Sequence, residues 1–599
     1  MPLLASAGHS ARAFLIDPRV AGMVCKGVIP SYGSSRDLYT LLRSAGDRVS
    51  THPRIGIFLC ECGGEISNRI DLGKIAERVR SLTGVADLAT QPFWCSPGGL
   101  AELGRRVTDG SLERVVVAGC SPRSHGNLLR DALGQVGLNR NFVQIVNLRE
   151  HCARVHPDQT EAATEKAHRL LKVGLAAARQ AERIETIEAD VNPEVAVVGG
   201  GVAGTTAALS LARREVTVHL IEQAPTLGGY LNHLAKLYPR HADAGEFVRA
   251  RVQQIQKSDP ITVHLNSRVT EIRGHTGAFE IVMEQGAEQK SIAAGAVIVA
   301  TGAEEPAPEG RGERTLSLTD LESRLRTGDV LPARIVFVLS AEGPTPGNPA
   351  SVAVIAQAAL ECAGAIRERH GEVALTVLFR DFPAGAKEAV QALAAGGVRF
   401  VRYSPERPPV VSNLGVEVEA FGNGKRESIE ADLVVQATGL APSGGTRRLG
   451  EGPLLWQDED GFLLEPHLRL RSEEVLDRGV FVAGTAHGPA DIPTSMAQAF
   501  GAAAAALALI RTGKIVKHAL VAEVVEDLCR GCGRCEEVCP FGAAELVLRE
   551  NGVKKSQVDR VLCVGCGFCA SECISGAIRL PFLTDRQLRS MVTAAALEG

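Results

Sequence analysis

EVAVVGGGVAGTTAALSLARREVTVHLIEQAPTLGG, residues 194–229, is the stretch that decides the fold of this chain. It opens with a short apolar run, Val195–Val198, which predicts a buried strand, and an Ala- and Leu-rich helix follows at once. A second predicted strand, Val216–Ile221, ends in the acidic residue Glu222. A strand, a helix and a strand with a terminal acid indicate a dinucleotide-binding α/β sheet, in which the acid holds a ribose hydroxyl.

Three glycines occupy the turn between the first strand and the helix. Gly199, Gly201 and Gly204 have the spacing G-x-G-x-x-G, which serves a tight turn, a close approach of pyrophosphate and close helix packing. The helix begins at Val202 and Ala203, where free N–H groups and a partial positive charge can hold a diphosphate. A plain glycine-rich turn is the alternative, but the flanking strand, helix and acid favour a dinucleotide.

Two segments farther along favour FAD over NAD as that dinucleotide. Gly228 and Gly229 come shortly after the ribose acid, which looks like the flavoprotein continuation of this fold. The apolar strand 296–302, AVIVATG, ends in a corner of small residues, and the stretch 434–439, VVQATG, repeats the pattern. The residues of the first corner are Ala300, Thr301 and Gly302. We therefore expect an α/β, thioredoxin-reductase-like FAD fold with two dinucleotide-binding domains.

The last predicted part of the FAD fold combines a strand, a loop and a helix. The strand 479–486, GVFVAGTA, contains Gly484, and the following loop reaches Asp491 and Ile492 before a helix over 494–510. In flavoproteins of this type such a helix points its N-terminus at the flavin ring and stabilises negative charge there. Asp491 is expected to orient the ribityl chain of FAD, to cap the helix, or both.

Length and composition indicate a protein with several globular domains. The 599 residues suffice for three or four domains, and 45% of them are hydrophobic. A net charge of −4 favours neither nucleic acid nor an anionic membrane as partner. The apolar run 499–510 is too short to cross a bilayer and predicts a core helix. No secretory signal pattern opens the chain, and close-set cysteines suit metal ligation, so we expect a cytoplasmic protein.

Two cysteine runs near the C-terminus carry the most specific chemical signal. Both have the spacing C-x2-C-x2-C-x3-C, and Pro540 follows the first run where Ile574 follows the second. This duplication predicts a bacterial-type ferredoxin domain with two [4Fe-4S] clusters, in which the fourth cysteine of each run ligates the other cluster. One cluster is expected to take Cys529, Cys532, Cys535 and Cys573, and the other Cys563, Cys566, Cys569 and Cys539.

Glycines interleave the two runs at positions 531, 533, 565 and 567. We expect them to let the backbone wrap closely around each cluster and to offer N–H groups to the sulfurs. A pair of structural zinc sites is the alternative, but zinc does not require this pattern of glycine and proline.

A separate small α/β domain is predicted to begin at Arg54. Its expected strands are residues 55–59, 115–118 and 142–146. Five cysteines fall at strand ends or in adjoining loops: Cys60, Cys62, Cys95, Cys120 and Cys152. An open α/β sheet collects its ligands at that edge, so these cysteines either hold one iron–sulfur cluster or are scattered buried thiols.

The middle of the FAD region, residues 331–403, stands where disulfide-reductase-type flavoproteins bind NAD(P). The turn after its first strand, 340–351, reads SAEGPTPGNPAS and has no G-x-G-x-x-G pattern. A redox Cys-x-x-Cys is missing near the flavin segments, because Cys362 stands alone on a predicted helix. We therefore expect neither nicotinamide binding nor thioredoxin-reductase-like chemistry.

The predicted domain order follows from these segments. It is an extension at 1–54, an α/β iron–sulfur domain at 55–185, an FAD domain at 186–518 with a degenerate middle domain at about 331–403, a ferredoxin domain at 519–580 and a helical tail at 581–599. A helix over 168–183 and an acidic linker over 184–194 are expected to join the second and third.

Four groups of motifs together resemble the A subunit of heterodisulfide reductase. They are CECGG at 60–64 with Cys95-Ser96, the runs 115–133 and 137–152, the FAD fingerprint with AGTAHGPADIPTSMAQA at 483–499, and the double ferredoxin motif. The resemblance covers roughly residues 55–599. It implies an oxidoreductase component, an FAD-carrying hub that passes electrons between partners; in some complexes of the family the flavin divides electron pairs between two acceptors.

The resemblance also implies ligands and partners. A further [4Fe-4S] cluster would be held by Cys62, Cys95, Cys120 and Cys152, with Cys60 as the substitute ligand. The implied assembly is a homodimeric core with heterodisulfide-reductase B- or C-like, hydrogenase-, dehydrogenase- or reductase-type subunits, or with ferredoxin.

Two departures set this chain apart from the family pattern. The stretches 231–247 and 339–364, where many members carry cysteines for a cluster beside the flavin, hold only Cys362. One thiolate cannot hold a [4Fe-4S] cluster, so we expect that cluster to be absent. Ala490 precedes Asp491 where similar members often place a lysine, so plain electron transfer competes with bifurcation. A self-contained NAD(P)H-dependent reductase and a structural hub with a largely silent flavin are the alternative functions.

Overall fold

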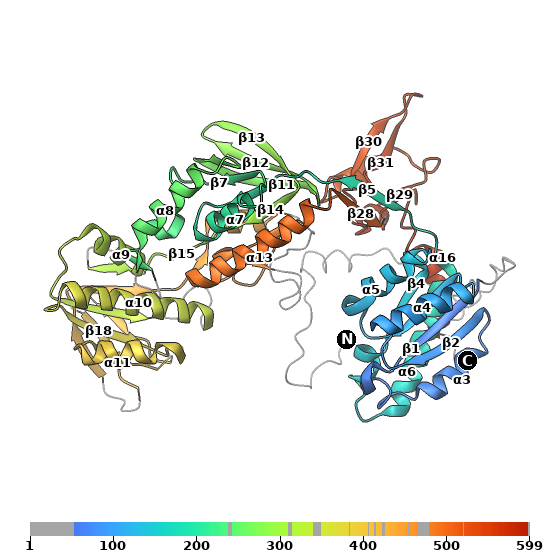
Figure 1. The fold of residues 1–599 in the computed structure, drawn as a ribbon, viewed down its shortest axis with the longest axis horizontal. Coiled ribbons are helices and arrows are strands. Elements are labelled where there is room, and N and C mark those ends of the chain that lie inside the picture. The colour runs from blue at the N-terminus through green and yellow to red at the C-terminus, as the bar shows by residue number, and fades with distance from the viewer. Residues whose placement is uncertain are drawn as a thin grey trace. The chain divides into compact units, whose positions relative to one another are not determined.

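The structure is a computed structural model, and it describes residues 53–237, 242–308, 314–339, 349–382, 384–404, 406–412, 415–421, 426–452, 454–464, 479–518 and 520–596. The extension predicted over 1–54 lies outside the described residues apart from Pro53 and Arg54, and so does most of the turn 340–351. The described residues form two compact units, one from residues 53–181 together with 586–596, and one within Glu182–Asp585 (Figure 1).

The first unit is built on a parallel sheet of four strands. In spatial order they are β2 (Val85–Gln91), β1 (Ile55–Cys60), β3 (Arg114–Gly119) and β4 (Val143–Asn147). Successive side chains of a strand face opposite sides, so Ile57 packs into one core and Phe58 into the other. The edge strand β2 was not predicted, because its sequence, VADLATQ, has no continuous apolar run. This agrees with its position, since its side chains are only partly buried.

Helices cover both faces of this sheet. On one face lie α3 (Leu72–Arg80) and α6 (Thr160–Gln180), and on the other α4 (Pro97–Asp109) and α5 (Pro122–Gln135). The predicted tail helix is confirmed as α16 (Asp585–Ala596), and Gln587 Nε2 in it donates to Gln180 O at 3.0 Å. The C-terminal residues thus pack in the first unit.

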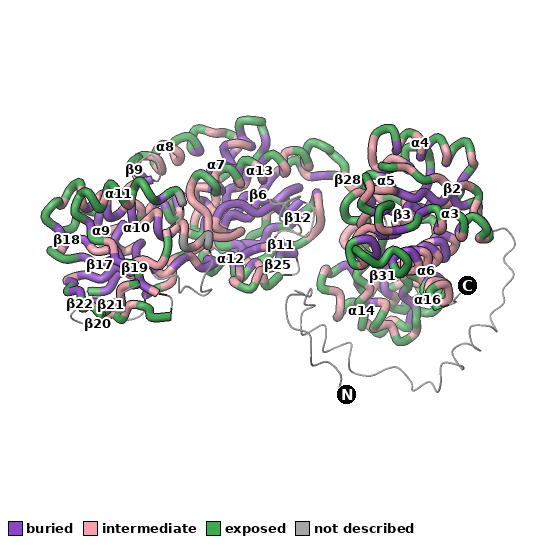
Figure 2. Tube along the Cα trace, turned by 90° about the horizontal axis from the view of Figure 1, so that it is seen from below, coloured by how far each residue is buried: buried purple, intermediate pink, exposed green. Residues whose placement is uncertain are grey.

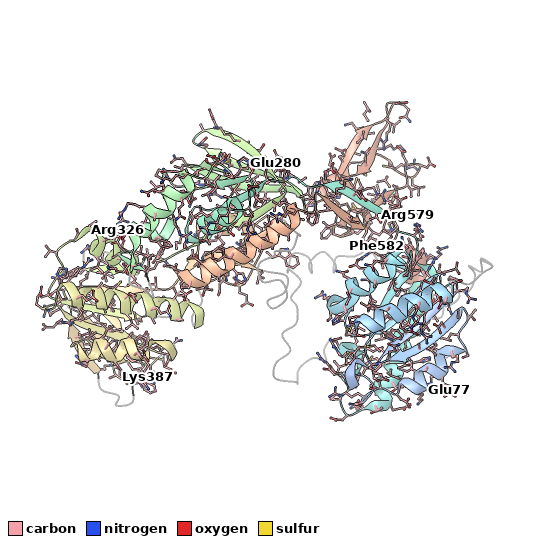
Figure 3. All side chains as sticks on the ribbon, viewed as in Figure 1. Glu77, Glu280, Arg326, Lys387, Arg579 and Phe582 are labelled. Carbon is pink, nitrogen blue, oxygen red and sulfur yellow. The ribbon has the colours of Figure 1, made fainter. Side chains whose placement is uncertain are left out.

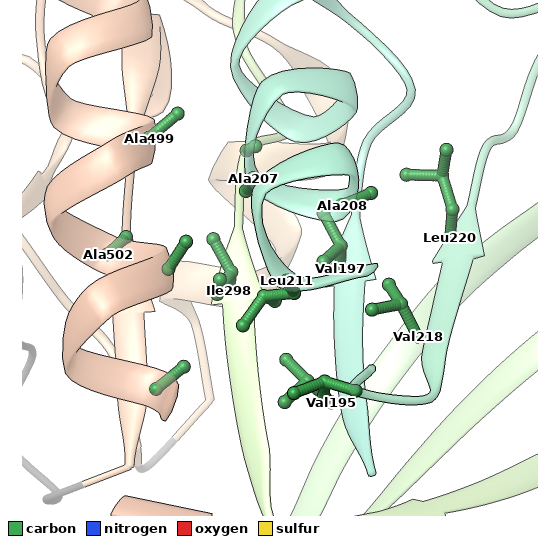
Figure 4. Packing of buried hydrophobic residues seen from close by; sticks show 14 of the residues in the cluster. Val195, Val197, Ala207, Ala208, Leu211, Val218, Leu220, Ile298, Ala499 and Ala502 are labelled. Atoms are coloured by element: carbon green, nitrogen blue, oxygen red, sulfur yellow. The ribbon is translucent and has the colours of Figure 1, made fainter. Parts of the chain in front are cut away.

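The second unit contains the dinucleotide fold as a parallel sheet of five strands. In spatial order they are β10 (Ile261–His264), β7 (Val218–Ile221), β6 (Val195–Val198), β14 (Ala296–Val299) and β27 (Val480–Val482). Alanines and leucines of α7 (Val202–Ala212) and α13 (Ile492–Ile510) pack on one face, against branched side chains of β6 and β14 (Figure 4). The antiparallel sheet β11–β13, residues 267–294, packs on the other face.

Helix α13 is, among the described residues, the one helix long and apolar enough to cross a membrane. Its 19 residues exceed the predicted run 499–510, so the length argument against a span does not hold. Ala499, Ala502 and Ala506 are buried in the core that α13 shares with α7. Figure 2 shows α7 and α13 beside the buried strand β6. One face of α13 therefore packs in the core of the FAD domain.

A second parallel sheet of five strands forms the middle domain. In spatial order they are β16 (Thr315–Ser317), β23 (Leu433–Ala437), β17 (Arg334–Leu339), β18 (Ala374–Phe379) and β19 (Arg399–Arg402). The sheet reaches beyond the predicted range 331–403, because β23 pairs with both β16 and β17. The repeated VVQATG stretch supplies β23, so it belongs to this sheet and not to the FAD sheet.

The acidic stretch 184–194 is not a plain linker, contrary to the prediction. Thr186–Asp190 forms strand β5, which pairs antiparallel with β28 (Lys514–His518). Its side chains alternate between exposed and half-buried positions, which is the pattern of a strand with one covered face. The chain therefore enters and leaves the FAD and middle domains through neighbouring strands.

The segment that follows is a small duplicated fold. Strand β29 (Glu523–Val524) pairs with β32 (Ile578–Arg579), and β30 (Ala544–Leu548) pairs with β31 (Lys554–Val558). Each cysteine run contains one short helix, α14 (Arg534–Glu537) or α15 (Phe568–Ser571). Arg579, labelled in Figure 3, joins β32 to β29 through an ion pair of 2.9 Å with Glu523.

Candidate functional site

The three glycines between β6 and α7 differ in what surrounds them. Gly199 has a φ of +109°, and a Cβ there would stand 2.2 Å from Ala300 O. A Cβ on Gly204 would stand 1.8 Å from Gly199 O, so only glycine lets α7 approach the turn this closely. A Cβ on Gly201, in contrast, would meet no atom within 4 Å. Gly199 and Gly204 therefore serve packing, whereas Gly201 faces the open space that a pyrophosphate needs.

The start of α7 is open to an anion. Gly201 is the N-cap residue and no side chain caps the first turn, so the N–H groups there are available to a diphosphate. The Gly228-Gly229 segment folds back over this turn. Gly228 N donates to Gly200 O at 2.9 Å, and a Cβ on Gly229 would lie 3.0 Å from Gly201 Cα. These residues fit the diphosphate of FAD.

Glu222 lies at the end of β7, as predicted, and its carboxylate is buried. Oε2 accepts a hydrogen bond from Gly200 N and Oε1 accepts one from Ala224 N, each at 2.7 Å. The carboxylate thus fixes the glycine turn as well as its own loop. Each oxygen keeps a further lone pair that can accept a ribose hydroxyl.

Two segments from the C-terminal end of the FAD domain, those of Gly484 and Ile492, pack against the glycine turn and the start of α7. A Cβ on Gly484 would stand 2.8 Å from Ala203 Cβ, and Gly484 N donates to Gln498 Oε1 at 2.9 Å. Val202 and Ile492 pack against one small apolar cluster. The structure therefore brings these four predicted residues together, and it adds Gln498, which no sequence motif indicated.

The corner Ala300-Thr301-Gly302 lies directly behind β14. Thr301 Oγ1 is 2.7 Å from Thr446 Oγ1, and Ser443 Oγ donates to Thr301 O at 2.9 Å. Gly302 has a φ of +78°, a conformation that glycine adopts without strain. Hydroxyl groups from the helix α12 (Gly444–Gly450) and its N-cap thus hold the corner in place.

Asp491 caps helix α13. Its Oδ1 accepts a hydrogen bond from Thr494 N at 2.8 Å, so the capping alternative is confirmed. A role toward the ribityl chain stays a prediction. With Ala490 beside it, this helix start carries a carboxylate and no neighbouring lysine.

In the duplicated C-terminal segment, one hollow is lined by sulfurs from both cysteine runs. Cys563, Cys566 and Cys569 of the second run surround it together with Cys539 of the first. The interleaved rule assigns this set to one cluster. Across the described residues no three His, Cys, Asp or Glu side chains converge closely enough to hold a single metal ion.

Backbone N–H groups reach the sulfurs in a pattern that repeats between the two halves. The donor–acceptor pairs are Ala543–Cys539 at 3.2 Å, Ala577–Cys573 at 3.3 Å, and Ser556–Cys529 and Ala522–Cys563 at 3.4 Å. Donors at these places stabilise the thiolate form that ligates iron.

None of these four contacts comes from glycines 531, 533, 565 or 567, so N–H donation by these glycines stays a prediction. All four have φ between +66° and +86° and serve the path of the chain. A Cβ on Gly531 would stand 2.2 Å from Lys554 O, and one on Gly565 would stand 2.1 Å from Leu520 O. Their first predicted role, close wrapping of the backbone, agrees with these contacts.

Four of the five N-terminal cysteines line one pocket of the first unit: Cys60, Cys62, Cys95 and Cys120. Cys60 is the last residue of β1, and the other three lie in the segments after β1, β2 and β3, of which β1 is the middle strand. Cys95 and Cys120 each precede a Ser-Pro pair, in which serine caps a helix and proline opens it. Cys62 has a φ of +53°, which is uncommon for a residue with a side chain and typical of functional sites.

Cys152 is not among the residues that line this pocket, so the cysteines that the pocket groups differ from the ligand set that the resemblance implied. Strand β4 is the edge strand beyond β3, and the turn after it, Arg149–Ala153, buries Cys152 completely. Its side chain packs in the core under α3 and α6. The structure groups Cys60, the substitute in the prediction, with the other three cysteines.

Arg149 brings a positive charge to this pocket, and sequence reasoning missed it. Its Nη1 is 3.2 Å from Cys62 Sγ, and its Nε donates to Glu150 Oε1 at 2.8 Å. Burial raises the pKa of the Cys120 thiol to about 11 and also raises the pKa of Cys60. The Cys60 and Cys120 thiols are therefore protonated at neutral pH when no metal is bound, and metal binding would release their protons.

Cys362 is a buried structural thiol. Its Sγ donates to Glu322 Oε1 at 2.8 Å, and Glu322 Oε2 accepts a hydrogen bond from Ala235 N at 2.8 Å. Burial raises the pKa of Cys362 well above its usual value. A thiol that stays protonated and hidden from solvent cannot serve as a redox nucleophile.

Fold and sites together define a class of protein, an oxidoreductase that combines an FAD-type domain with an iron–sulfur domain of the ferredoxin type. Residues 193–499 match the family model described as pyridine nucleotide-disulphide oxidoreductase, and residues 528–577 match the 4Fe-4S dicluster domain. The predicted fold class is confirmed.

Whole-chain relatives identify the family. The first of two iron–sulfur A subunits of CoB–CoM heterodisulfide reductase from Methanopyrus kandleri is 31% identical, over 91% of this chain and 98% of that protein. The A subunit of H2:CoB-CoM heterodisulfide,ferredoxin reductase from Methanothermobacter marburgensis is 29% identical, over 82% of this chain and 91% of that protein. The chain belongs to the family of heterodisulfide reductase A subunits, which are iron–sulfur flavoproteins, as the motif order predicts. Thioredoxin reductase of T. acidophilum is 18% identical with a TM-score of 0.40, over 53% of this chain and 97% of that chain.

Proposed function

We propose that the chain is the electron-transfer hub of a larger oxidoreductase complex, in which electrons pass between FAD and iron–sulfur clusters. One observation carries the proposal: the compact unit Glu182–Asp585 holds both the open glycine turn and the cysteine-lined hollow. Bound FAD can take up two electrons, whereas each [4Fe-4S] cluster exchanges one. Gly201 and the start of α7 would hold the diphosphate, and Glu222 would hold the ribose.

We further propose three [4Fe-4S] clusters. Two would lie in the ferredoxin domain, with the interleaved ligands given above. The third would lie in the N-terminal pocket, with the ligands Cys60, Cys62, Cys95 and Cys120. The shared pocket supports this set over one that includes the buried Cys152.

The proposed partners are other redox subunits and ferredoxin, around a homodimeric core in the cytoplasm. The names of two relatives support redox subunits and ferredoxin as partners. One relative belongs to an H2:CoB-CoM heterodisulfide,ferredoxin reductase and another to a ferredoxin/F420H2-dependent CoB-CoM heterodisulfide reductase. Cys532 and Cys566 are exposed, so each ferredoxin-type cluster would have an edge that a partner can approach. The described cysteines form no disulfides, which suits a reducing compartment.

The flavin could pass electrons in two ways, by plain electron transfer or by bifurcation, and an experiment can distinguish them. The carboxylate of Asp491 at the start of α13, with Ala490 beside it, offers no side-chain cation for a reduced flavin and favours plain transfer. Under bifurcation, one electron donor would reduce a high-potential and a low-potential acceptor in equal amounts. Reduction of only one acceptor in the reconstituted complex would support plain transfer.

The first test is iron and acid-labile sulfide per FAD on anaerobically purified protein, with EPR after dithionite reduction. We expect about twelve irons per FAD, four for each cluster. About eight would contradict the N-terminal cluster and leave the ferredoxin pair. Reduced ferredoxin should then reduce the flavin; failure to do so would support a structural hub, and steady NADH oxidation with a dye acceptor would support a self-contained reductase.

A further inference from the structure

A charged pocket lies where α7, α8 (Ala244–Gln256) and α13 meet in the FAD domain. The three helices are neighbours in Figure 1. Arg213, Arg251, Phe247 and Phe500 line the pocket, which holds about 530 Å³ of empty space including its open mouth. Arg213 follows the last residue of α7, so the pocket lies toward the end of that helix opposite the diphosphate turn.

Arg251 is held in this pocket by neutral groups. Nη1 donates to Thr206 Oγ1 at 2.9 Å, Nη2 contacts Met496 Sδ at 3.7 Å, and the guanidinium carbon stands 4.7 Å from the centre of the Phe247 ring. The Nε atom is buried and has no acceptor. An arginine stays charged in proteins, so a half-buried guanidinium with neutral partners bears an uncompensated charge.

A second cation stands close to the first. Burial lowers the pKa of Arg251, and the charge of the exposed Arg213 lowers it further. Within the described ranges neither arginine forms an ion pair with a carboxylate. An anion bound between them would relieve both the repulsion and the missing counter-charge.

The composition of the pocket selects the kind of anion. Two guanidinium groups match the charge of a phosphate monoester, about −1.5 to −2 at pH 7, and their planar forks match its oxygens. The carboxylate of an acidic side chain carries a single charge and would leave one guanidinium unpaired. Phe500, 49% exposed, offers a ring face on which a flat apolar group can stack.

We propose that this pocket binds the phosphate monoester of a small aromatic ligand of the nucleotide type, with phosphate between Arg213 and Arg251 and the ring system over Phe500. The proposal is independent of the electron-transfer function. The site is distinct from the glycine turn that would hold FAD.

Calorimetric titration of the full-length, FAD-loaded protein with 5′-AMP tests the proposal, with adenosine and inorganic phosphate titrated in parallel. We expect saturable AMP binding, weaker phosphate binding and no measurable adenosine binding. Arg213→Gln and Arg251→Gln should each weaken AMP binding by about tenfold or more, as loss of a charge-assisted hydrogen bond does. Phe500→Ala should weaken binding of AMP and leave that of phosphate unchanged.

Matched controls remove the same charge outside the pocket. Arg214 follows Arg213 directly and Arg249 lies on α8, and both are exposed. Arg214→Gln and Arg249→Gln should leave AMP binding unchanged. Because Arg213 is also exposed, its variant tests the site without a change in the core.

Several results would overturn the proposal. They are the absence of saturable AMP binding, undiminished binding in Arg213→Gln, or equal losses in the pocket and control variants. Binding of a glutamate-rich peptide that depends on Arg213, with no binding of AMP, would assign the pocket to an acidic protein partner instead.

Discussion

The two cysteine-rich regions of this molecule differ in how the chain supplies the sulfurs and in which polar groups contact them. In the ferredoxin-type segment the sulfurs come from two short runs, and backbone N–H groups serve them in a pattern that the duplication repeats. In the N-terminal domain the sulfurs lie at or after the ends of three adjacent strands, and the polar side chains beside them are Arg149, near Cys62, and His125, near Cys120. Backbone donors are fixed by the fold, whereas a guanidinium depends on one residue.

This difference determines how each site can be adjusted. A substitution cannot remove a backbone N–H other than by proline, so these four backbone contacts persist through most substitutions. A single substitution at Arg149 would change the charge of the N-terminal pocket. We therefore expect substitutions to change the reduction potential of the N-terminal cluster more readily than the potentials of the two ferredoxin clusters.

Cys539→Ser has the largest expected effect. It should remove the cluster that Cys563, Cys566 and Cys569 share with it, about four irons per FAD, and loosen a core that contains two of those sulfurs. Iron analysis and EPR should show that the other ferredoxin cluster remains. Cys362→Ser is the control and should lose no iron. Loss of the cluster bound by the first run, with the second intact, would contradict the interleaved assignment.

Cys60→Ser and Cys152→Ser compare the two candidate ligands of the N-terminal site. We expect Cys60→Ser to lose about four irons and Cys152→Ser to lose none, because Cys60 lines the pocket and Cys152 is enclosed in another core. Both variants should keep the two ferredoxin EPR signals. The reverse result would restore the ligand set implied by the sequence.

Arg149→Gln should lower the reduction potential of the N-terminal cluster alone. Loss of a cation 3.2 Å from a ligating sulfur disfavours the added electron, by on the order of 50 mV or about 1.2 kcal/mol. Arg149→Lys keeps the charge and should recover most of the shift. Redox titration followed by EPR measures both, and equal shifts in all clusters would contradict a local charge effect.

Ser556→Ala should give a smaller shift in the ferredoxin domain. Ser556 Oγ stands 3.1 Å from Cys535 Sγ, and the duplicated position in the other half is Ala522, which has no hydroxyl. We expect the potential of the cluster that Cys535 ligates to fall by on the order of 20 mV, about 0.5 kcal/mol. The potential of the second ferredoxin cluster should not change.

Glu322→Gln has the smallest expected effect. Glu322 contacts Cys362, the cysteine that belongs to neither cysteine-rich site. Burial raises the pKa of Glu322, so the folded chain keeps a proton that the unfolded chain has already lost. The stability linked to this proton is present below the unfolded-state pKa and is lost as pH rises through the folded-state pKa. Melting temperatures between pH 4 and pH 8 should fall less steeply in the variant. Glu305, whose pKa burial also raises, should leave a residual slope.

Prediction from sequence succeeded where ligands are close along the chain. The cysteine runs span eleven residues each, so spacing alone fixes which sulfurs can meet. The glycine turn was equally predictable, because its strand, helix and acid form one continuous unit. Glu222 and Gly201 accordingly lie where the pattern places them.

Prediction from sequence and structure differ where the order of strands decides which loops meet. Cys152 follows a strand end like the other cysteines, but β4 lies at the sheet edge and the turn after it enters a different core. Gln498 and Arg149 belong to no motif, since each acts on a group far away in sequence. The partly exposed strand β2 offered no apolar run, and β5 was hidden in an acidic stretch.

The pairing of β5 with β28 has a consequence for the history of this chain. The polypeptide enters the FAD and middle domains through β5 and leaves them through β28, which pairs with β5. More than three hundred residues therefore lie between two adjacent strands. A block with adjoining ends can be inserted into, or removed from, a host protein with little disturbance of its surroundings. The paired strands β5 and β28 thus form a domain boundary suited to gene fusion, at which a flavoprotein could be joined to different iron–sulfur domains.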